Sequence, residues 1–194
     1  MNLDSLGWTP FFQEHFAEFA AEGLAPARVA LEHREVYDVF SESGAQRALV
    51  SGRFRHKALC KSDFPTVGDC VALEAGGERD AIIHAVLPRH SKFARGYSSK
   101  SPTEQERLIA VNIDTLCLVT GLDDDFNLRR IERYVTLAWD SGAKPVIVLN
   151  KADLCESVED RLAEVERIAL GVPVHAVSAQ DGHVESLKSY LESG

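Results

Sequence analysis

The spacing of hydrophobic positions changes twice along this 194-residue chain. Between residues 11 and 21, four phenylalanines recur at helical intervals with glutamates among them. This pattern predicts one amphipathic helix that ends at Gly23 and packs its aromatic stripe against a core.

Residues 28–95 follow a different rhythm, in which apolar and polar residues alternate over short runs. Five such runs occur, at residues 29–31, 36–40, 48–50, 67–73 and 81–87. Turn-forming residues such as Gly44, Pro65 and Gly76 separate most of them. Five short strands at near-regular spacing predict a small β-barrel, for which an OB-like fold is the natural candidate. The spacing alone does not distinguish an OB-like barrel from an SH3-like one.

Beyond Pro102 the pattern becomes one of alternating strands and helices. The almost continuous apolar run at 113–120 is expected to be a strand buried on both faces. Further strands are predicted at 146–149 and 172–177, and helices at 127–140, 158–170 and 184–191. This order predicts a three-stranded parallel sheet with crossover helices. Sheets usually carry more strands, so we expect a partial α/β domain.

Charge is distributed unevenly along the chain. The net charge is −9, yet residues 1–42 carry −6, residues 43–103 carry +5 and residues 104–194 carry −8. A basic middle segment within an acidic chain is a candidate surface for a phosphate-rich partner. The alternative is a basic face that is merely solvated.

Several classes of protein are disfavoured by the sequence. The most apolar stretch, residues 108–122, contains Asn112 and Asp114 and is shorter than the roughly 18 residues of a membrane span. The N-terminus lacks the basic and apolar regions of a secretory signal, so we expect a cytoplasmic protein with no membrane partner. The 4 cysteines form no C-x-x-C pair and are interpreted as free thiols, mostly buried.

The charged residues around position 125 are given structural roles. Asp123, Asp124 and Asp125 precede a predicted helix, where acids offset the helix dipole and cap free N–H groups. They lack the ligand spacing of a calcium loop, and no metal site is predicted anywhere in the chain. The arginines of the helix itself are expected on its surface.

The most specific chemical signal is Asn150-Lys151-Ala152-Asp153, which directly follows the predicted strand at 146–149. Ligands of open parallel sheets bind at the carboxyl ends of strands, so the position suits a binding loop. Asp153 can accept hydrogen bonds from the N1–H and N2 amino groups of guanine, whereas adenine presents an acceptor at N1. Asn150 is expected to support the loop and contact the purine, and the stem of Lys151 to cover the base. The alternative is a charged loop that matches N-K-x-D by chance.

Ser178-Ala179, at the end of the next predicted strand, adds to this signal. A backbone N–H at this position could reach guanine O6, and small residues allow the backbone to approach the base. Ser-Ala alone is a weak signal, but its place one helix after N-K-x-D favours guanine recognition.

No phosphate-binding loop is found in the 194 residues. The sequence contains no G-x-x-x-x-G-K-[ST] motif and no Gly-Lys pair, so no residue of this chain is predicted to be catalytic. In ordinary GTPases the phosphate motifs precede N-K-x-D, yet here a predicted barrel lies upstream. This order indicates either a permuted domain whose phosphate half lies downstream or a domain that has lost that half.

The motifs together resemble the ribosome-small-subunit-dependent GTPases of the RsgA/YjeQ family. The resemblance covers nearly the entire chain, through Val67-Gly68-Asp69, Val86-Leu87-Pro88-Arg89, Asn112-Ile113-Asp114, residues 128–134 and the N-K-x-D motif. It implies an N-terminal OB fold, a circularly permuted GTPase domain in which N-K-x-D and S-A precede the P-loop, and a C-terminal zinc domain. It also implies that this chain is the N-terminal part of such a protein.

The function that the resemblance implies is maturation of the small ribosomal subunit, with GTP hydrolysis stimulated by that particle. The implied partners are the small subunit, its rRNA and GTP or GDP with Mg²⁺, and DNA is not expected. Zinc is implied only for the C-terminal domain outside this chain. The expected nucleotide contacts are Asn150, Lys151, Asp153, Ser178 and Ala179. The expected RNA contacts are Arg53, Arg55, His56, Lys57, Lys61, Arg89, Lys92 and Arg95, with Phe54, Phe93 or Tyr97 available for base stacking.

Three regions are therefore expected. They are an N-terminal helical extension over residues 1–27, an OB-fold RNA-binding domain over 28–101 and a partial permuted GTPase domain over 102–194. Because the P-loop is missing, this chain alone is expected to be catalytically incompetent. The alternative from another class is a stand-alone, non-enzymatic RNA-binding module with a structural α/β domain.

Overall fold

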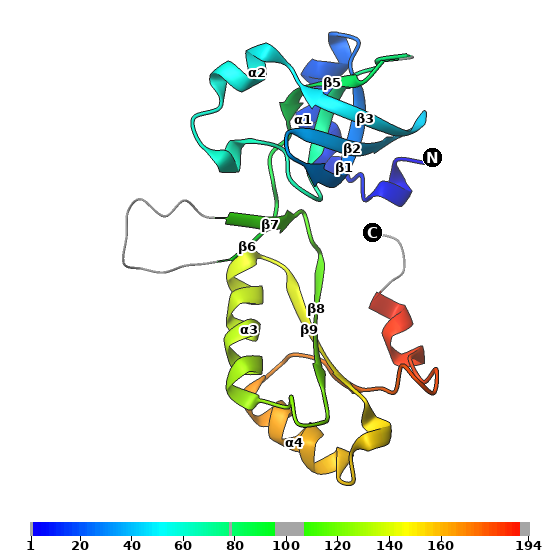
Figure 1. Cartoon of the computed structure of the whole chain (residues 1–194), viewed down its shortest axis with the longest axis vertical. Helices are drawn as coiled ribbons and strands as arrows, with labels where there is room; N and C mark the ends of the chain where they lie inside the picture. The colour runs from blue at the N-terminus through cyan, green and yellow to red at the C-terminus, as the bar shows by residue number, and fades with distance from the viewer. Residues whose placement is uncertain (1, 78, 96–106, 191–194) are drawn as a thin grey trace. The chain divides into compact units, whose positions relative to one another are not determined.

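The computed structural model describes residues 2–77, 79–95 and 107–190 (Figure 1). The described residues divide into two compact units, which we call the barrel unit (to Ile113) and the α/β unit (from Asp114). The expected boundary between residues 101 and 102 lies outside the described residues.

Five strands form a closed barrel in the order β1-β2-β3-β5-β4. They are β1 (Ala25–His33), β2 (Val36–Ser41), β3 (Gly44–Val50), β4 (Cys70–Glu74) and β5 (Ala81–Val86). All neighbours are antiparallel except β3 and β5, and β4 pairs back with β1 to close the barrel. The predicted OB-like barrel is confirmed, and this strand order selects it over the SH3-like alternative.

The barrel interior is filled by the alternate residues of its strands. In β2, Tyr37 and Val39 point into the core while their neighbours are only partly buried. The register of β1 against β2 shifts between Val29 and Leu31, a β-bulge that bends the strand around the barrel. Tyr37, Leu73 and Ile83 are at most 2% exposed and are the largest side chains of this core.

Helix α1 (Pro10–Ala21) is the predicted amphipathic helix. It begins with a proline at its first turn, where no intrahelical N–H bond is lost. Phe12 and Phe16 are buried against Cys70 and Leu87, in a second cluster of the same unit. A 3-10 turn, η1 (Asp4–Leu6), precedes the helix.

Several short elements of the barrel unit were not predicted. Helix α2 (Gly52–Lys57) follows β3, and the 3-10 turn η2 (Lys61–Asp63) follows α2. Strands β6 (Lys92–Arg95) and β7 (Arg107–Val111) pair antiparallel as a separate two-stranded sheet.

Hydrogen bonds of buried Asn112 hold the end of β7 against the barrel. Asn112, which is 2% exposed and has a positive φ of 55°, donates to the Gly68 carbonyl and accepts from the His90 N–H, both at 3.0 Å. Arg28 donates to the Asn112 carbonyl at 2.9 Å. A side chain at Gly68 would place its Cβ 2.1 Å from the Val111 carbonyl oxygen. Only a glycine fits between β7 and the barrel at this point.

The α/β unit has a three-stranded parallel sheet in the order β10-β9-β8, which confirms the predicted partial α/β fold. Its elements are β8 (Thr115–Gly121), α3 (Leu128–Ser141), β9 (Lys144–Asn150), η3 (Ala152–Leu154), α4 (Val158–Ile168), β10 (Val174–Ala176) and η4 (Glu185–Tyr190). The last of these is a 3-10 helix rather than the predicted α-helix.

The two faces of this sheet are covered differently. Helices α3 and α4 supply Ile131, Val135 and Val165 to a core with Ile147 and Leu149 of β9. The segment around η4, red in Figure 1, packs on the other face.

The expectation that β8 is buried on both faces is wrong. Val119 is 64% exposed, because β8 is the edge strand and η4 covers only the β9 side of that face. The expectation of mostly buried thiols is also corrected, since of the four free cysteines only Cys70 is buried.

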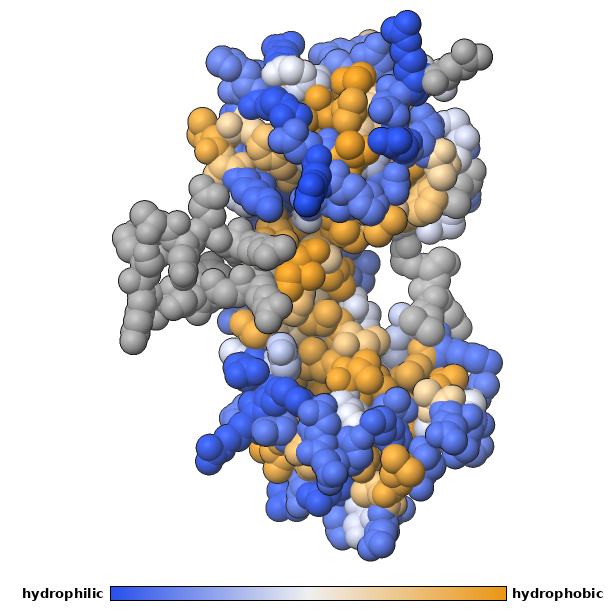
Figure 2. Space-filling view, viewed as in Figure 1, coloured by the Kyte–Doolittle hydropathy of each residue, from blue (hydrophilic) through white to orange (hydrophobic). Residues whose placement is uncertain are grey.

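The face drawn in Figure 2 is mainly hydrophilic, with apolar patches on both units. Leu59 in the barrel unit and Leu170 in the α/β unit are the most exposed large apolar residues described, at 94% and 83%. Within the described ranges, no helix has the length and apolar character needed to cross a membrane.

Candidate functional site

The N-K-x-D loop lies where β9 ends, beside the end of β10. Lys151 has a φ of 64°, in the left-handed region, which turns the chain sharply out of β9 into η3. The Ala152 N–H then donates to the Val177 carbonyl at 3.0 Å. This contact fixes the loop against the segment that carries Ser178 and Ala179, so the structure brings all five expected nucleotide contacts to one edge of the sheet.

Asp153 is held by Ser178. The Ser178 hydroxyl donates to Asp153 Oδ1 at 2.7 Å, and Ser178 Oγ itself accepts the Asp181 N–H at 3.2 Å. Ser178 is 4% exposed, whereas Asp153 is exposed. The buried Ser178 hydroxyl therefore orients one oxygen of the Asp153 carboxylate, and the carboxylate itself is exposed to a ligand. A small residue was expected at Ser178, and this role of its hydroxyl was not predicted.

Asn150 joins the ends of all three strands. Its side-chain oxygen accepts the Ala179 N–H at 3.1 Å, and its backbone carbonyl accepts the Leu122 N–H at 2.8 Å. The loop-supporting role expected for Asn150 is present. A backbone N–H of the Ser178-Ala179 segment was expected to meet guanine O6. The Ala179 N–H is donated to Asn150 here, so a ligand that uses it would have to share it or replace that bond.

Lys151 is paired with Asp123, from the loop after β8. The Nζ to Oδ2 distance is 2.5 Å, and the Asp123 carboxylate also accepts the Asp125 N–H. This hydrogen bond lowers the pKa of Asp123 and raises the pKa of Lys151. Gly121 leaves room for the pair, because a Cβ there would lie 2.5 Å from Asp123 Oδ1. The ammonium end of Lys151 is thereby positioned beside the loop.

The acidic triplet does not cap helix α3 as expected. Asn127 is the N-cap, and its side chain accepts the Arg130 N–H at 3.0 Å. Arg130 forms two hydrogen bonds to the Asp125 carboxylate, at 2.8 and 2.7 Å, which lower the pKa of Asp125. Asp123 and Lys151 lie 28 positions apart in the sequence, whereas Asp125 and Arg130 lie 5 positions apart. Only the Asp125–Arg130 contact has a spacing that a sequence pattern could show.

The arrangement suits recognition of a polar ring edge. It offers an oriented carboxylate at Asp153, an amide at Asn150, a backbone N–H at Ala179 and the long stem of Lys151 within one loop cluster. A guanine edge presents adjacent N–H donors beside a carbonyl acceptor, which this set of groups complements. In the part of the chain that the structure describes, no group of three or more His, Cys, Asp or Glu side chains could hold a metal ion.

Helix α2 carries four basic residues of the barrel unit. Ser51 caps it by accepting the Phe54 N–H at 3.0 Å, and its exposed side chains are Arg53, Arg55, His56 and Lys57. Arg55 forms an ion pair with Glu35 at 2.7 Å. Phe54, which was expected to be available for base stacking, packs against the barrel core instead. Four of the eight expected RNA contacts thus share one short helix.

Arg89, one of the expected RNA contacts, is occupied by contacts within the barrel unit. Its guanidinium donates to both carboxylate oxygens of Asp69, at 2.7 and 2.6 Å, and to the Ser62 and Phe64 carbonyls. Asp69 is fully buried; burial raises the pKa of its carboxyl, and the Arg89 guanidinium opposes that rise. A phosphate contact would require Arg89 to leave a buried carboxylate unpaired.

The remaining expected RNA contacts are placed unevenly. Lys61 is exposed in η2 and Lys92 is exposed in β6. The side chain of Arg95 and the whole of Tyr97 lie outside the described residues.

Comparison with known proteins gives a consistent picture. A profile of the RsgA GTPase family matches residues 86–194. The chain is 44% identical over its whole length to the small ribosomal subunit biogenesis GTPase RsgA of Opitutus terrae, and 40% identical to that of Syntrophotalea carbinolica. In both cases it covers 55% of the relative, so the chain spans about half the length of the curated proteins it matches.

Solved structures show the same fold. YjeQ from Thermotoga maritima superposes with a TM-score of 0.68 at 25% identity, over 87% of this chain and 57% of that one. YloQ, a circularly permuted GTPase, superposes with a TM-score of 0.62 at 20% identity, over 86% of this chain and 55% of that one.

Proposed function

Because this chain belongs to the RsgA GTPase family, we propose that it acts in the cytoplasm in maturation of the small ribosomal subunit, binding guanine nucleotide and rRNA. The two activities fall on different units. The α/β unit carries the guanine-reading loop, and the barrel unit carries the basic helix α2.

The observation that carries the nucleotide proposal is the Ser178–Asp153 contact. A carboxylate that reads guanine must keep both oxygens in the plane of the base edge, and the buried Ser178 hydroxyl fixes one of them at 2.7 Å. Asn150 and Ala179 lie beside it, and Lys151 is steadied by Asp123. Preorganised groups of this kind lose little conformational freedom when the ligand binds.

Hydrolysis is proposed for longer proteins of the family rather than for these 194 residues alone. Phosphoryl transfer needs groups that hold the phosphates and Mg²⁺, and the sequence contains no Gly-Lys pair from which a phosphate-binding loop could be built. Guanine nucleotide should therefore bind this chain weakly, through the base alone. Stimulation by the small subunit and a zinc-binding domain are likewise proposed for the longer proteins.

RNA binding is proposed for the exposed cations of α2, together with Lys61 of η2 and Lys92 of β6. Lys and Arg bind the phosphates of single-stranded RNA, and OB-like barrels present such residues along one face. Arg89 is not included, because it is committed to Asp69.

Asp153→Asn tests the nucleotide proposal on this chain. Asparagine replaces one acceptor oxygen with a donor amide, so guanine loses a partner while the C2 carbonyl of xanthine gains one. We expect preference to move from GDP towards XDP by about ten-fold or more, measured by amide shifts in NMR titrations at millimolar nucleotide.

Asp181→Asn is the matched control, since it makes the same change at an exposed residue three positions after Ser178. This control should keep the preference of the wild type. If Asp153→Asn also keeps the GDP preference, Asp153 does not read the base and the proposal fails.

A further inference from the structure

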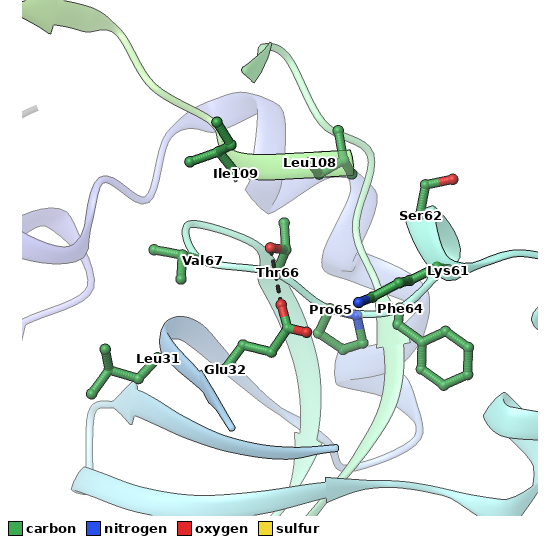
Figure 3. Close-up of a pocket in the computed structure, with 10 residues that line it drawn as sticks. All are labelled: Leu31, Glu32, Lys61, Ser62, Phe64, Pro65, Thr66, Val67, Leu108 and Ile109. Atoms are coloured by element: carbon green, nitrogen blue, oxygen red, sulfur yellow. Dashed lines mark hydrogen bonds between the residues drawn. The ribbon is translucent and has the colours of Figure 1, made fainter. Parts of the chain in front are cut away.

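The barrel unit contains a cavity of about 530 Å³ that the proposed nucleotide site does not use. Figure 3 shows Leu108 and Ile109 of β7 on one side of the space and Leu31 and Glu32 of β1 on the other. The rest of its lining comes from the segment between η2 and β4, namely Lys61, Ser62, Phe64, Pro65, Thr66 and Val67.

The two sides of the cavity present apolar surface to each other. Leu31 is 51% exposed and Ile109 is 44% exposed, so both aliphatic side chains are only half covered by the protein itself. Val67 lies between them along the wall (Figure 3). A flat ring inserted here would bury apolar area on both of its faces.

Two charged groups, one acidic and one basic, line this mainly apolar cavity. The Glu32 carboxylate accepts a hydrogen bond from the Thr66 hydroxyl at 3.3 Å, which holds it at the wall. The ammonium group of Lys61 points toward the space in Figure 3. Among the ion pairs found in the described ranges, none involves Lys61. An occupant would therefore meet an acceptor at one point and a cation at another.

We propose that this cavity binds one unstacked nucleotide of an RNA strand, with its base between Leu31 and Ile109 and its phosphate at Lys61. This inference rests on the proposed RNA binding by the barrel unit and extends it to a second, base-reading site. The volume of about 530 Å³ lies within the range of small-molecule pockets and is ample for a single nucleotide.

The position of Lys61 favours RNA over a protein side chain. Helix α2 ends at Lys57, and Lys61 opens η2, so the exposed cations of α2 lead along the chain directly to the cavity. A strand whose phosphates follow these cations would reach Lys61 with its next base free to turn inward. Sequence-specific recognition of RNA commonly works in this way, on bases removed from the stack.

The Glu32 carboxylate sets the base preference. A carboxylate accepts hydrogen bonds and donates none, so it selects a base edge with an exocyclic amino group. Cytosine, adenine and guanine carry such a group, whereas uracil has a single ring N–H between two carbonyls. The cavity should therefore bind uridine least well.

The test compares two RNA octamers by fluorescence anisotropy on the full 194-residue chain: oligo-uridine, and the same octamer with one central cytidine. Cytidine avoids the guanine-reading loop of the α/β unit. We expect the cytidine octamer to bind about ten-fold more tightly. Leu31→Ser and Ile109→Ser should each remove most of that advantage, because each removes apolar surface from a wall of the cavity. Both residues are about half exposed, so the fold should tolerate the substitutions.

Glu32→Gln separates base reading from general electrostatics. Removal of a negative charge should tighten binding of oligo-uridine slightly, while the advantage of cytidine falls to about two-fold. A purely structural role of Glu32 would not move the two octamers in opposite directions. Leu170→Ser, which makes the same apolar-to-polar change on the α/β unit, is the matched control and should leave both affinities unchanged.

The outcomes distinguish this inference from the proposed function. The three cavity variants could prefer the cytidine octamer as strongly as the wild type does, while reversal of the α2 charges weakens the binding of both octamers. In that case the cavity is not a nucleotide site, and the proposed RNA binding by α2 is retained. If the α2 reversal also has no effect, RNA binding by the barrel unit fails. If cavity amides in NMR shift with N-acetylphenylalanine amide and not with either octamer, the cavity takes an apolar protein side chain and the inference is overturned.

Discussion

At the scale of single residues, Gly68 has the strictest steric requirement in the barrel unit. Its φ is 92°, and a Cβ would lie 2.1 Å from the Val111 carbonyl oxygen. The backbone around it cannot move freely, since Gly68 also accepts from buried Asn112. Gly68→Ala should therefore lower the free energy of unfolding by about 2–4 kcal/mol, measured by urea denaturation.

Gly23→Ala provides the comparison for Gly68→Ala. Gly23 has a similar φ of 80°, but nothing lies within 4 Å of a Cβ built there. Alanine at Gly23 should cost only the backbone strain, about 1 kcal/mol. Equal costs at the two positions would show that the close approach of β7 to the barrel does not contribute to stability.

Tyr37 should make the free energy of unfolding of the barrel unit depend on pH in the alkaline range. Burial raises its pKa from 10.0 to about 12, with smaller contributions from Glu32 and Glu35. The folded state thus holds the phenolic proton more tightly than the unfolded state does. This contribution is fully present below pH 10 and is lost as the pH rises towards 12, by up to about 3 kcal/mol.

Urea denaturation at pH 8, 10 and 11 measures this dependence. The wild type should lose stability between pH 10 and 11, and Tyr37→Phe should lose less over the same interval. A Tyr37→Phe variant with the same pH dependence as the wild type would assign the loss to other groups, such as the buried Cys70, whose pKa burial raises to about 11.

The sequence indicated which motif residues gather at the edge of the sheet better than it indicated the residues that support them. N-K-x-D and Ser-Ala are short motifs at strand ends, and both lie at one edge of the sheet. The Asp123–Lys151 pair joins residues 28 positions apart, and nothing local indicates it. The buried pair of Arg89 with Asp69 was not predicted for the same reason, because the two residues lie 20 positions apart and charge counting cannot show burial.

At the scale of elements, the β1–β2 hairpin has an unfavourable turn sequence. Arg34 and Glu35 both have positive φ, 35° and 77°, in a two-residue turn that usually contains Asn-Gly. Replacing Arg34-Glu35 by Asn-Gly should relieve this strain. The gain should exceed the loss of the exposed Glu35–Arg55 ion pair, because such pairs contribute at most about 1 kcal/mol.

We expect the Asn-Gly variant to melt a few degrees higher in circular dichroism. Glu35→Gln is the control, since it removes the charge of the ion pair and keeps the strained backbone. It should melt at or slightly below the wild-type temperature. A lower melting temperature for Asn-Gly than for Glu35→Gln would show that the ion pair, not the turn, dominates.

Long helices were predicted well, and the short helix α2 was not. Helices α1, α3 and α4 each span three turns or more, enough for an apolar stripe to show in the sequence. Helix α2 has only six residues, and its cap by Ser51 is the one local signal. The burial of β8 was overestimated because an apolar run in the sequence does not show where a strand lies in its sheet. The strand order places β8 at the edge.

At the scale of the whole molecule, the surfaces proposed to bind RNA and guanine nucleotide belong to different compact units. Arg53, Arg55 and Lys57 changed together to Glu should weaken binding to small-subunit RNA. The slope of log affinity against log salt should fall by about one unit for each phosphate that the variant no longer binds. GDP affinity should not change, because the nucleotide loop has its own core in the α/β unit.

The matched control reverses Lys144, Arg167 and Lys188, three exposed cations of the α/β unit, so the change in net charge is identical. RNA affinity and salt slope should then stay close to those of the wild type. Equal losses of affinity in the two triple variants would mean that net charge alone, and not the α2 surface, governs RNA binding.

The parallel pairing of β3 with β5 determines when the barrel can form as the chain is synthesised. The first four strands can assemble as β4-β1-β2-β3, which leaves β3 and β4 as open edges. Only β5 pairs with both of them, and it is the last barrel strand to be made. At typical rates of synthesis the chain needs about one to two seconds to pass from Glu74, where β4 ends, to Val86, where β5 ends. During that interval the two unpaired edges can pair with other nascent chains, so a pause in translation here is the moment of greatest risk of aggregation.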